Sequence, residues 1–360
     1  MAGDSLGFLR AVEGLPEQLA AAHESASVIL DRAALPRPDE IDHIVVLGMG
    51  GSGIAGDVLR AVASSLPVPV IVLKQIRTPA FVGRRTLAFA VSYSGNTEET
   101  NTMTEGALDA GARVVAVTGG GDLAALAAAR GAIHVPCAEG YVMPRAAIGA
   151  LVAPLFVAPF HMGLYPEAHA LLVQAQAQLK RRGDQCRPDT GPANPARELA
   201  RRIGRSIPLI YGGGALGGVA AYRWKCDINE NAKAPAFCAA YPELDHNEIC
   251  GWGQHGDVTR QVMTLVSLRH GFEHGRLSAR IDRTTELIEE ALLQVLDVQA
   301  EGEGRLAQLL DLMYLGDWVS YYLALDNDVD PGPIDAITQL KATLSAQGDG
   351  SPRAATGTST

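Results

Sequence analysis

Short apolar runs alternate with helical or glycine-rich stretches in the first part of the chain. The runs lie at residues 44–47, 70–73, 87–91, 113–117 and 132–135. After the first run, Ile54, Val58 and Val62 recur at the spacing of one helix face. Strands that alternate with helices are typical of βα units, which together form a parallel sheet with helices on both faces. The pattern therefore predicts a doubly wound α/β domain.

The same pattern restarts after residues 183–196, a stretch rich in proline and polar residues that predicts a linker. The second half contains an apolar run at 207–211, a glycine-rich turn, a helix from Val219, strands at 262–268 and 293–298, and a long helix at 306–325. We interpret the two halves as a divergent duplication, with one domain over 1–182 and another over 197–344. Residues 345–360 contain no core-forming side chains, which predicts a disordered tail.

Residues 146–164 are almost wholly apolar and approach the length of a membrane span. Pro154, Pro159 and His161 interrupt the segment, which begins directly after Arg145. These features favour a buried helix at a domain or subunit interface over a helix that crosses a membrane.

Composition narrows the class of protein. The 360 residues carry a formal net charge of −10, which argues against a nucleic-acid or anionic-membrane partner. The five cysteines form no C-x-x-C pair, and free thiols are typical of a reducing cytosol. No basic stretch followed by an apolar core opens the chain, so no export signal is visible and we expect a cytoplasmic protein.

Two turns that follow apolar runs carry groups that could bind an anion. Ser92-Tyr93-Ser94-Gly95-Asn96-Thr97 places three hydroxyls around a glycine, and Gly48-Met49-Gly50-Gly51-Ser52-Gly53 follows the first apolar run. Hydroxyls and backbone N–H groups at a helix N-terminus can hold a phosphate without a metal. A turn that only caps a helix has the same kind of composition.

The glycine-rich turn also fits Gly-x-Gly-x-x-Gly, a fingerprint of dinucleotide-binding folds. That fingerprint expects an acidic residue about 20 residues later, at the end of the next strand. The run at 70–73 ends instead in Lys74-Gln75, with no acidic residue nearby. A nicotinamide-dependent dehydrogenase therefore lacks part of its signature, and dinucleotide binding would separate it from the alternatives.

Six motifs in one order resemble a known family. They are Gly50-Gly51-Ser52-Gly53, the hydroxyl turn at 92–97, Met143-Pro144-Arg145, Asn229-Glu230-Asn231-Ala232-Lys233, Asp245-His246-Asn247 and Lys341. Together they resemble the sugar isomerase (SIS) fold and, within it, the bifunctional phosphoglucose/phosphomannose isomerases of archaea and some bacteria. The resemblance implies two SIS-type α/β domains with parallel sheets. It also implies the interconversion of glucose 6-phosphate with fructose 6-phosphate, with mannose 6-phosphate as a second candidate substrate.

The resemblance further implies a role for individual residues. The sugar phosphate would be bound by Gly51, Ser52, Ser92, Ser94 and Thr97. Glu230 would move the proton, Arg145 would steady the intermediate, and His246 with Lys341 would assist ring opening. In the family the histidine reaches the site from the neighbouring subunit, so we expect a homodimer in which His246 acts across the interface.

The isomerisation reaction itself requires a base, a cation and a group for ring opening. Aldose–ketose isomerisation moves a proton between C2 and C1 through a cis-enediol, and a carboxylate such as Glu230 can reach both carbons from one face. Negative charge grows on two sugar oxygens, and the guanidinium of Arg145 would keep its charge when buried. Ring opening needs a group that titrates near neutrality, which suits His246. This mechanism requires neither a metal nor a cofactor.

Each of these residues also has a plainer interpretation. Glu230 could be a solvated carboxylate at a helix end, Arg145 an anchor for the apolar segment and Lys341 a surface lysine. His246 could lie in an exposed turn or in a metal cluster. His270 and His274 have the i, i+4 spacing of two zinc ligands, but glycines weaken a helix there and no third ligand is evident.

Two alternatives concern the function as a whole. A regulatory SIS protein that binds a sugar phosphate without turnover needs only the hydroxyl turn, whereas the four further residues and the lack of a helix-turn-helix pattern in residues 1–43 favour the enzyme. Dual-specific family members carry a threonine shortly before the C-terminal lysine. This chain has Asp330-Pro331-Gly332-Pro333-Ile334 there, with Thr338 as the only nearby hydroxyl, and Gly332 could enlarge the pocket or remove a contact. The sequence therefore leaves open the choice between glucose, mannose and a modified sugar phosphate.

Overall fold

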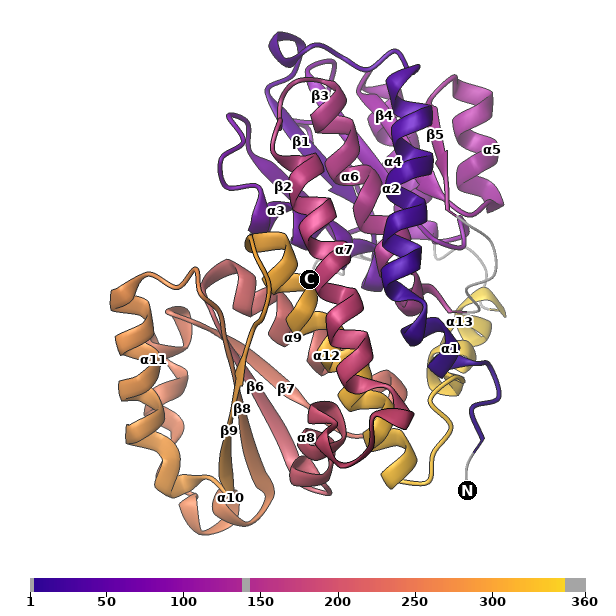
Figure 1. Ribbon diagram of the computed structural model, residues 1–360. Coiled ribbons are helices and arrows are strands. Elements are labelled where there is room, and N and C mark those ends of the chain that lie inside the picture. Colours follow the sequence, from indigo (N-terminus) through magenta and orange to yellow (C-terminus); the bar gives the residue numbers. More distant parts are fainter. Residues whose placement is uncertain (1–2, 138–142, 347–360) are drawn as a thin grey trace, which may run out of the picture.

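The computed structural model describes residues 3–137 and 143–346, which form two parallel β-sheets flanked by helices (Figure 1). In the N-terminal half the strand order is β2-β1-β3-β4-β5. The strands span His43–Leu47 (β1), Val70–Leu73 (β2), Thr86–Val91 (β3), Arg113–Thr118 (β4) and Ile133–Pro136 (β5). The helices of this half span Phe8–Glu13 (α1), Leu15–Asp31 (α2), Pro38–Glu40 (η1), Gly50–Val62 (α3), Glu98–Asp109 (α4), Gly121–Arg130 (α5), Pro144–Ala147 (η2), Ile148–His161 (α6) and Ala168–Cys186 (α7).

The C-terminal half contains a smaller sheet of order β7-β6-β8-β9. Its strands span Ile207–Gly213 (β6), Phe237–Tyr241 (β7), Met263–Arg269 (β8) and Gln294–Gln299 (β9). Its helices span Pro188–Ala193 (η3), Pro195–Ile203 (α8), Gly214–Asn231 (α9), Glu243–His246 (η4), Glu248–Gly251 (η5), Gly256–Val262 (α10), Gly275–Ile288 (α11), Glu289–Ala291 (η6), Arg305–Asp326 (α12) and Asp335–Ala346 (α13). The prediction of a doubly wound α/β protein is confirmed.

Strand β1 shows why these apolar runs form central strands. Ile44 and Val46 point to one side of the sheet and pack in the largest hydrophobic cluster, whereas Val45 and Leu47 pack in a second cluster under α4 and α5. Side chains alternate between the two faces of a strand, so a strand covered by helices on both faces must be apolar throughout. A short unbroken apolar run is the sequence signature of such a strand.

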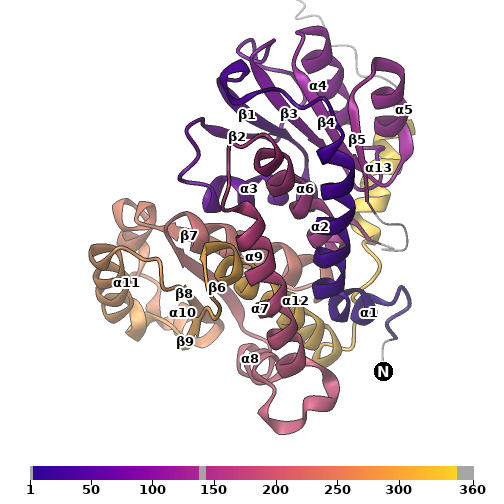
Figure 2. The ribbon, with the colours of Figure 1, turned by 45° about the horizontal axis from the view of Figure 1, so that its top comes forward.

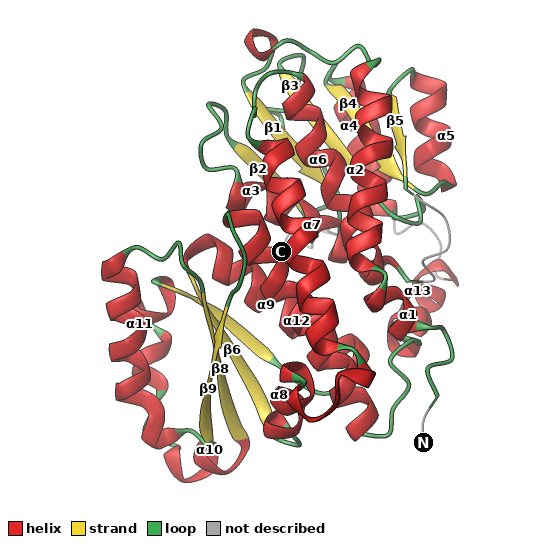
Figure 3. Cartoon of the chain, viewed as in Figure 1, coloured by secondary structure: helices red, strands yellow, loops and turns green. Residues whose placement is uncertain are grey.

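The two halves share one core. The largest cluster contains side chains from α2, α3 and α6 under the N-terminal sheet, and from α9 and α12 against the C-terminal sheet. Figures 2 and 3 show α7, α9 and α12 between the two sheets. The outer face of the C-terminal sheet packs a separate cluster against α11. Because the inner helices belong to one core, the two sheets are held in a fixed relation.

The predicted strands agree with the observed ones to within one or two residues at each end. Val262, the predicted first residue of one strand, is instead the last residue of α10, and the sequence pattern missed β7 altogether. Strand β7 is an edge strand, and its first residue, Phe237, is 54% exposed.

Helix α6 corresponds to the apolar segment at 146–164. The window Pro144–His161 has the length and hydropathy of a membrane span, but 83% of it is buried inside the chain. It packs against α2, α3 and α7. The prediction of a buried helix is confirmed, and the helices that cover it belong to the same chain.

The predicted linker at 183–196 is made of structured elements. It includes the end of α7, all of η3 and the start of α8, and the amide of Asn194 donates to the carbonyls of Cys186 and Arg187. The predicted tail lies outside the described residues from 347 onward, while Ser345 and Ala346 are the last residues of α13.

Candidate active site

The carboxyl ends of β1 and β3 mark the point where the strand order of the N-terminal sheet reverses. Strand β1 lies between β2 and β3, so the chain leaves β1 toward one edge of the sheet and leaves β3 toward the other. In open α/β sheets, the crevice at such a switch point is where ligands bind. Both predicted phosphate turns follow these two strands, so the fold brings them together.

The hydroxyl turn after β3 is held open by a glycine. Gly95 has φ 70°, and a Cβ atom there would lie 1.8 Å from the carbonyl oxygen of Gly120, so only glycine fits. Thr97 is the N-cap residue of α4, yet its hydroxyl is 3.0 Å from that of Ser92 and does not cap the helix. Ser94 is exposed. The three hydroxyls therefore gather at the N-terminus of α4, where an anion is favoured.

The glycine-rich turn after β1 lies against the backbone of Arg145. Ser52 is 6% exposed in the first turn of α3. A Cβ atom on Gly51 would lie 3.4 Å from the Cα of Arg145 and 3.6 Å from the carbonyl oxygen of Pro144. Because Gly51 has no side chain, η2, which carries Arg145, can lie close to the two predicted phosphate-binding turns.

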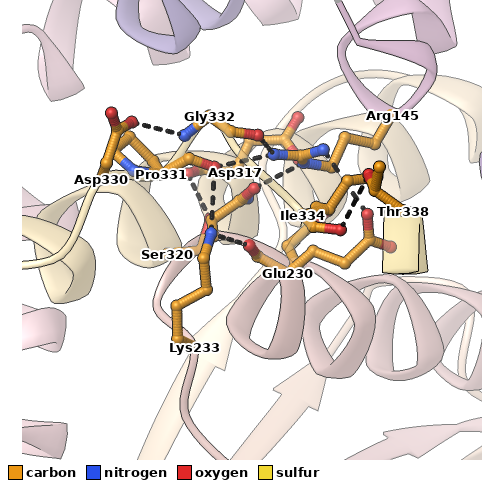
Figure 4. A network of polar contacts seen from close by, with 12 residues as sticks. Arg145, Glu230, Lys233, Asp317, Ser320, Asp330, Pro331, Gly332, Ile334 and Thr338 are labelled. Atoms are coloured by element: carbon orange, nitrogen blue, oxygen red, sulfur yellow. Dashed lines mark hydrogen bonds and ion pairs between the residues drawn. The ribbon is translucent and has the colours of Figure 1, made fainter. Parts of the chain in front are cut away.

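The Arg145 side chain is 4% exposed, and most of its donors are used (Figure 4). Its Nε donates to Oδ1 of Asn231 at 2.7 Å, and its Nη2 donates to the carbonyls of Pro331 and Gly332, each at 2.7 Å. Its Nη1 has no hydrogen-bond partner among the described residues. Burial lowers the pKa of Arg145, and the nearby Glu230 carboxylate opposes that shift. A buried cation with one free donor is suited to an anionic oxygen.

Glu230 faces that free donor. It lies in the last turn of α9, its side chain is 31% exposed, and its Oε2 is 3.6 Å from Nη1 of Arg145. The carboxylate is thus neither fully solvated nor closed off, and the Arg145–Glu230 pair comes from two segments far apart in the chain. The interpretation of Glu230 as a purely solvated helix-end carboxylate does not fit this geometry.

A second buried network, which the sequence reasoning missed, holds the backbone of Arg145. Arg223 on α9 donates through Nη2 to the carbonyl oxygen of Arg145 and to Oδ1 of Asp317, both at 2.8 Å. Its Nε is 2.7 Å from a carboxylate oxygen of Asp227, whose pKa burial holds well above the usual range. The i, i+4 spacing of Arg223 and Asp227 was a signal for an ion pair on one helix face.

The turn at 330–332 contributes backbone rather than side chains. The carbonyls of Pro331 and Gly332 accept from Arg145. A Cβ atom on Gly332 would lie 2.8 Å from Cβ of Leu6, so this position faces the N-terminal segment. A side chain at position 332 would therefore meet the Leu6 side chain, while the effect of Gly332 on the choice of sugar stays a prediction. Thr338, in the first turns of α13, donates to the carbonyl of Ile334 at 3.3 Å.

His246 and Lys341 lie apart from this centre. His246 is exposed in η4, which follows β7, and Lys341 is exposed in α13. Within residues 3–137 and 143–346, neither makes a hydrogen bond or ion pair with Arg145 or Glu230. The chain thus brings together the two predicted phosphate-binding turns, Arg145 and Glu230, and leaves the two predicted ring-opening groups at the surface.

The glycine turn of the C-terminal sheet is filled by the protein itself. A Cβ atom on Gly213 would lie 3.1 Å from Oε1 of Glu273, and the same carboxylate pairs with Arg269 at 2.9 Å. His270 bonds through Nε2 to the carbonyl of Gly213 at 2.9 Å, and Nδ1 of His274 accepts from the amide of Arg276 at 3.2 Å. Both histidines of the considered zinc pair are therefore bonded to the backbone, and a carboxylate of the protein lies beside the glycine turn of the C-terminal sheet.

Comparisons with known proteins place the chain in a family. Residues 192–344 match the bacterial phosphoglucose isomerase C-terminal SIS domain. The bifunctional phosphoglucose/phosphomannose isomerase of Caldicellulosiruptor bescii is 35% identical over 94% of this chain and 98% of its own length. An enzyme of the same name from Thermoplasma acidophilum is 35% identical over 86% of this chain and 92% of its own length. The crystal structure of a hypothetical protein from Thermus thermophilus shares the fold with a TM-score of 0.70, at 18% identity over 96% of this chain and 92% of that chain.

Proposed function

Since the chain belongs to the family of bifunctional phosphoglucose/phosphomannose isomerases, we propose that it is an aldose–ketose isomerase that interconverts glucose 6-phosphate with fructose 6-phosphate. Mannose 6-phosphate is the second proposed substrate. The observation that supports this most strongly is the buried Arg145 beside Glu230, with one guanidinium donor free. An enediol reaction needs a base and a fixed cation, and this pair supplies both next to the proposed phosphate site at the turns after β1 and β3.

We propose that the substrate phosphate binds at the carboxyl ends of β1 and β3. Its oxygens would accept from the hydroxyls of Ser52, Ser92, Ser94 and Thr97 and from the backbone N–H of Gly51. The two helix N-termini at this edge add favourable partial charge. The sugar would then extend from the cradle toward Arg145, since Gly51 adjoins the backbone of that residue.

In the proposed reaction Glu230 is the base. From an open-chain aldose phosphate, its carboxylate takes the proton on C2, the C2 electron pair forms the C1–C2 double bond, and the carbonyl π-electrons move to O1. The resulting cis-enediolate carries negative charge that Nη1 of Arg145 is placed to stabilise. Glu230 then returns the proton to C1, proton exchange between O2 and O1 completes the ketose, and the carboxylate is regenerated.

Ring opening would need groups that the single chain does not place beside Glu230. We propose that His246 of a second subunit and Lys341 complete the site, so that the working form is a homodimer. Support for this comes from the exposed position of His246 and from α13, whose described side chains at 335–343 are all exposed. A helix of 12 residues gains little stability on its own, so α13 is suited to packing against a partner.

The proposed setting is the cytoplasm. All five cysteines are free thiols in the structure, as expected in a reducing compartment. The reaction uses a proton carrier and a fixed cation from the protein itself, so the proposed chemistry has no step that a metal or an organic cofactor must supply.

One coupled assay tests the function. Fructose 6-phosphate is supplied, and the appearance of glucose 6-phosphate and mannose 6-phosphate is followed separately. Formation of either product supports the isomerase, and the ratio of the two rates gives the preference at C2. If fructose 6-phosphate binds but neither product forms, the non-catalytic sugar-phosphate-binding protein replaces the enzyme.

A further inference from the structure

Lys233 has a strained backbone at the end of the helix that carries Glu230. Its φ is 53°, in the left-handed region. Residues other than glycine seldom adopt this conformation, because their Cβ atom comes too close to the backbone. Strain of this kind persists only where the surrounding structure holds the residue in place. A left-handed residue is also a common way to end a helix, so the contacts of the Lys233 side chain decide whether it does more than end α9.

The ammonium group of Lys233 contacts two backbone carbonyls. Its Nζ donates to the carbonyl oxygen of Glu230 at 2.5 Å and to the carbonyl oxygen of Pro331 at 3.5 Å. The left-handed backbone turns the lysine back over the last turn of α9, where both acceptors can be reached. Figure 4 shows Lys233, Glu230 and the turn at 330–332 around the Arg145 guanidinium.

The carbonyl oxygen of Pro331 is shared by the side chains of Arg145 and Lys233. It accepts from Nη2 of Arg145 at 2.7 Å as well as from Lys233. Lys233 is thus linked to the backbone of the proposed base and, through one shared oxygen atom, to the proposed electrophile. The neighbouring Asn231 accepts from Nε of Arg145 at 2.7 Å, whereas the side chains of Glu230 and Arg145 are 3.6 Å apart without a hydrogen bond. Lys233 thus adds a second link between the end of α9 and the surroundings of Arg145.

Further hydrogen bonds connect this turn to the N-terminal segment. Asp330 accepts from the amide of Ser5 at 3.2 Å and from the amide of Gly332 at 2.9 Å. The pKa of Asp330 is lowered overall: burial acts against this shift, and hydrogen bonds and the charge of Lys233 outweigh it. Because the turn leads into α13, a change in the turn also changes the support of that helix.

We propose that Lys233 is a positioning residue of the isomerase. By tying the backbone of Glu230 to the carbonyl that Arg145 also holds, it fixes the base and the electrophile relative to each other. This inference rests on the proposed function. It differs from a simple role in ending α9, because a helix-ending role would be met equally well by glycine, which adopts the left-handed conformation without strain.

Lys233→Gly separates the two roles. The glycine removes the ammonium group and relieves the backbone strain, so the folded protein should melt no lower than the parent. If Lys233 positions the site, kcat for fructose 6-phosphate falls about tenfold while KM changes less than about threefold, because the phosphate cradle is untouched. Lys233→Arg keeps a cation that can reach both carbonyls, and it should recover most of the lost kcat. Lys180→Met, at an exposed position of α7, is the matched control and should behave as the parent.

Hydrogen exchange gives a readout independent of turnover. In Lys233→Gly the backbone amides of 335–343 should exchange faster by about tenfold, since the turn that supports α13 has lost one of its two cations. A kcat within about twofold of the parent in Lys233→Gly, or unchanged exchange in α13, overturns the proposal. If Lys233→Gly does not fold, Lys233→Met is judged by the same two criteria. A parent protein without isomerase activity would refute the proposed function, whereas the exchange measurement would still decide whether Lys233 supports the turn.

Discussion

Nη1 of Arg145 lies 3.6 Å from Oε2 of Glu230, and it is the one guanidinium nitrogen of Arg145 without a hydrogen-bond partner in the described structure. The other two nitrogens are occupied by an amide oxygen and two backbone carbonyls. The protein thus fixes the orientation of the guanidinium and leaves one edge of it available beside a carboxylate. The proposed mechanism depends on this relationship, and it leads to the following predictions.

Arg145→Lys should lower kcat by about 100-fold or more while changing KM much less, because the interaction is made with charge that develops in the transition state. A lysine cannot reach the oxygen of Asn231 and the carbonyls of Pro331 and Gly332 while still presenting a donor to the substrate. Steady-state kinetics of the folded variant, with its melting temperature as control, provide the test. A kcat within tenfold of the parent would remove Arg145 from the proposed mechanism.

Ser94→Ala should act mainly on KM. The exposed Ser94 hydroxyl accepts from the amide of Asn96 at 3.3 Å and can still donate its own proton to a phosphate. The loss of one hydrogen bond to a charged oxygen costs roughly 1.5–3 kcal/mol. The apparent KM for fructose 6-phosphate should therefore rise by about tenfold or more with little change in kcat. Ser25→Ala, at an exposed position of α2, is the control. Unchanged KM in both Ser94→Ala and Thr97→Ala would mean that the phosphate binds elsewhere.

Activity should survive exhaustive treatment with EDTA. The proposed electrophile is a guanidinium, and among the described residues no three His, Cys, Asp or Glu side chains are grouped to hold a metal ion. The measurement is the isomerase rate before and after chelation. A loss of activity that zinc restores would show that the surroundings of His246 were misinterpreted.

Subunit mixing tests the shared site. Glu230→Gln and His246→Ala protein should each be inactive as homodimers, and a mixed dimer should contain one site with both native groups. After subunit exchange, activity should return to at most about half of the sites in each mixed dimer. Confirmed exchange without any return of activity contradicts the action of His246 across an interface, and a monomer in light scattering at working concentration would contradict it earlier.

Much of the fold follows from local patterns in the sequence. Strands β1 and β3 were predictable because they are buried on both faces and so read as unbroken apolar runs. Strand β7 was missed because it is a half-exposed edge strand with alanines and a cysteine, close after Pro235. The apolar segment of α6 was correctly expected to be buried, but its partners are helices of the same chain, which the segment's own composition cannot reveal.

The candidate site was predictable only where a motif carries it. The hydroxyl turn and Glu230 stood out because each lies in a short motif of fixed spacing. The partners of Arg145 did not, because backbone carbonyls at 331–332 have no sequence signature and Asn231 acts at long range. His246 and Lys341 make no hydrogen bond or ion pair with Arg145 or Glu230 within the described chain, so their part in the site rests on the proposed second subunit.

The central claim is that Glu230 carries the proton between C2 and C1. In deuterated water, wild-type protein should exchange the C1 hydrogen of fructose 6-phosphate with solvent while it forms the aldose, and Glu230→Gln should do neither, although it binds the sugar phosphate within a few-fold of the parent. The amide keeps the shape of the side chain but cannot accept the proton. We predict that Glu230→Gln isomerises the sugar and exchanges the hydrogen at less than about one hundredth of the wild-type rate. Turnover above that level would contradict the role of Glu230 as the base.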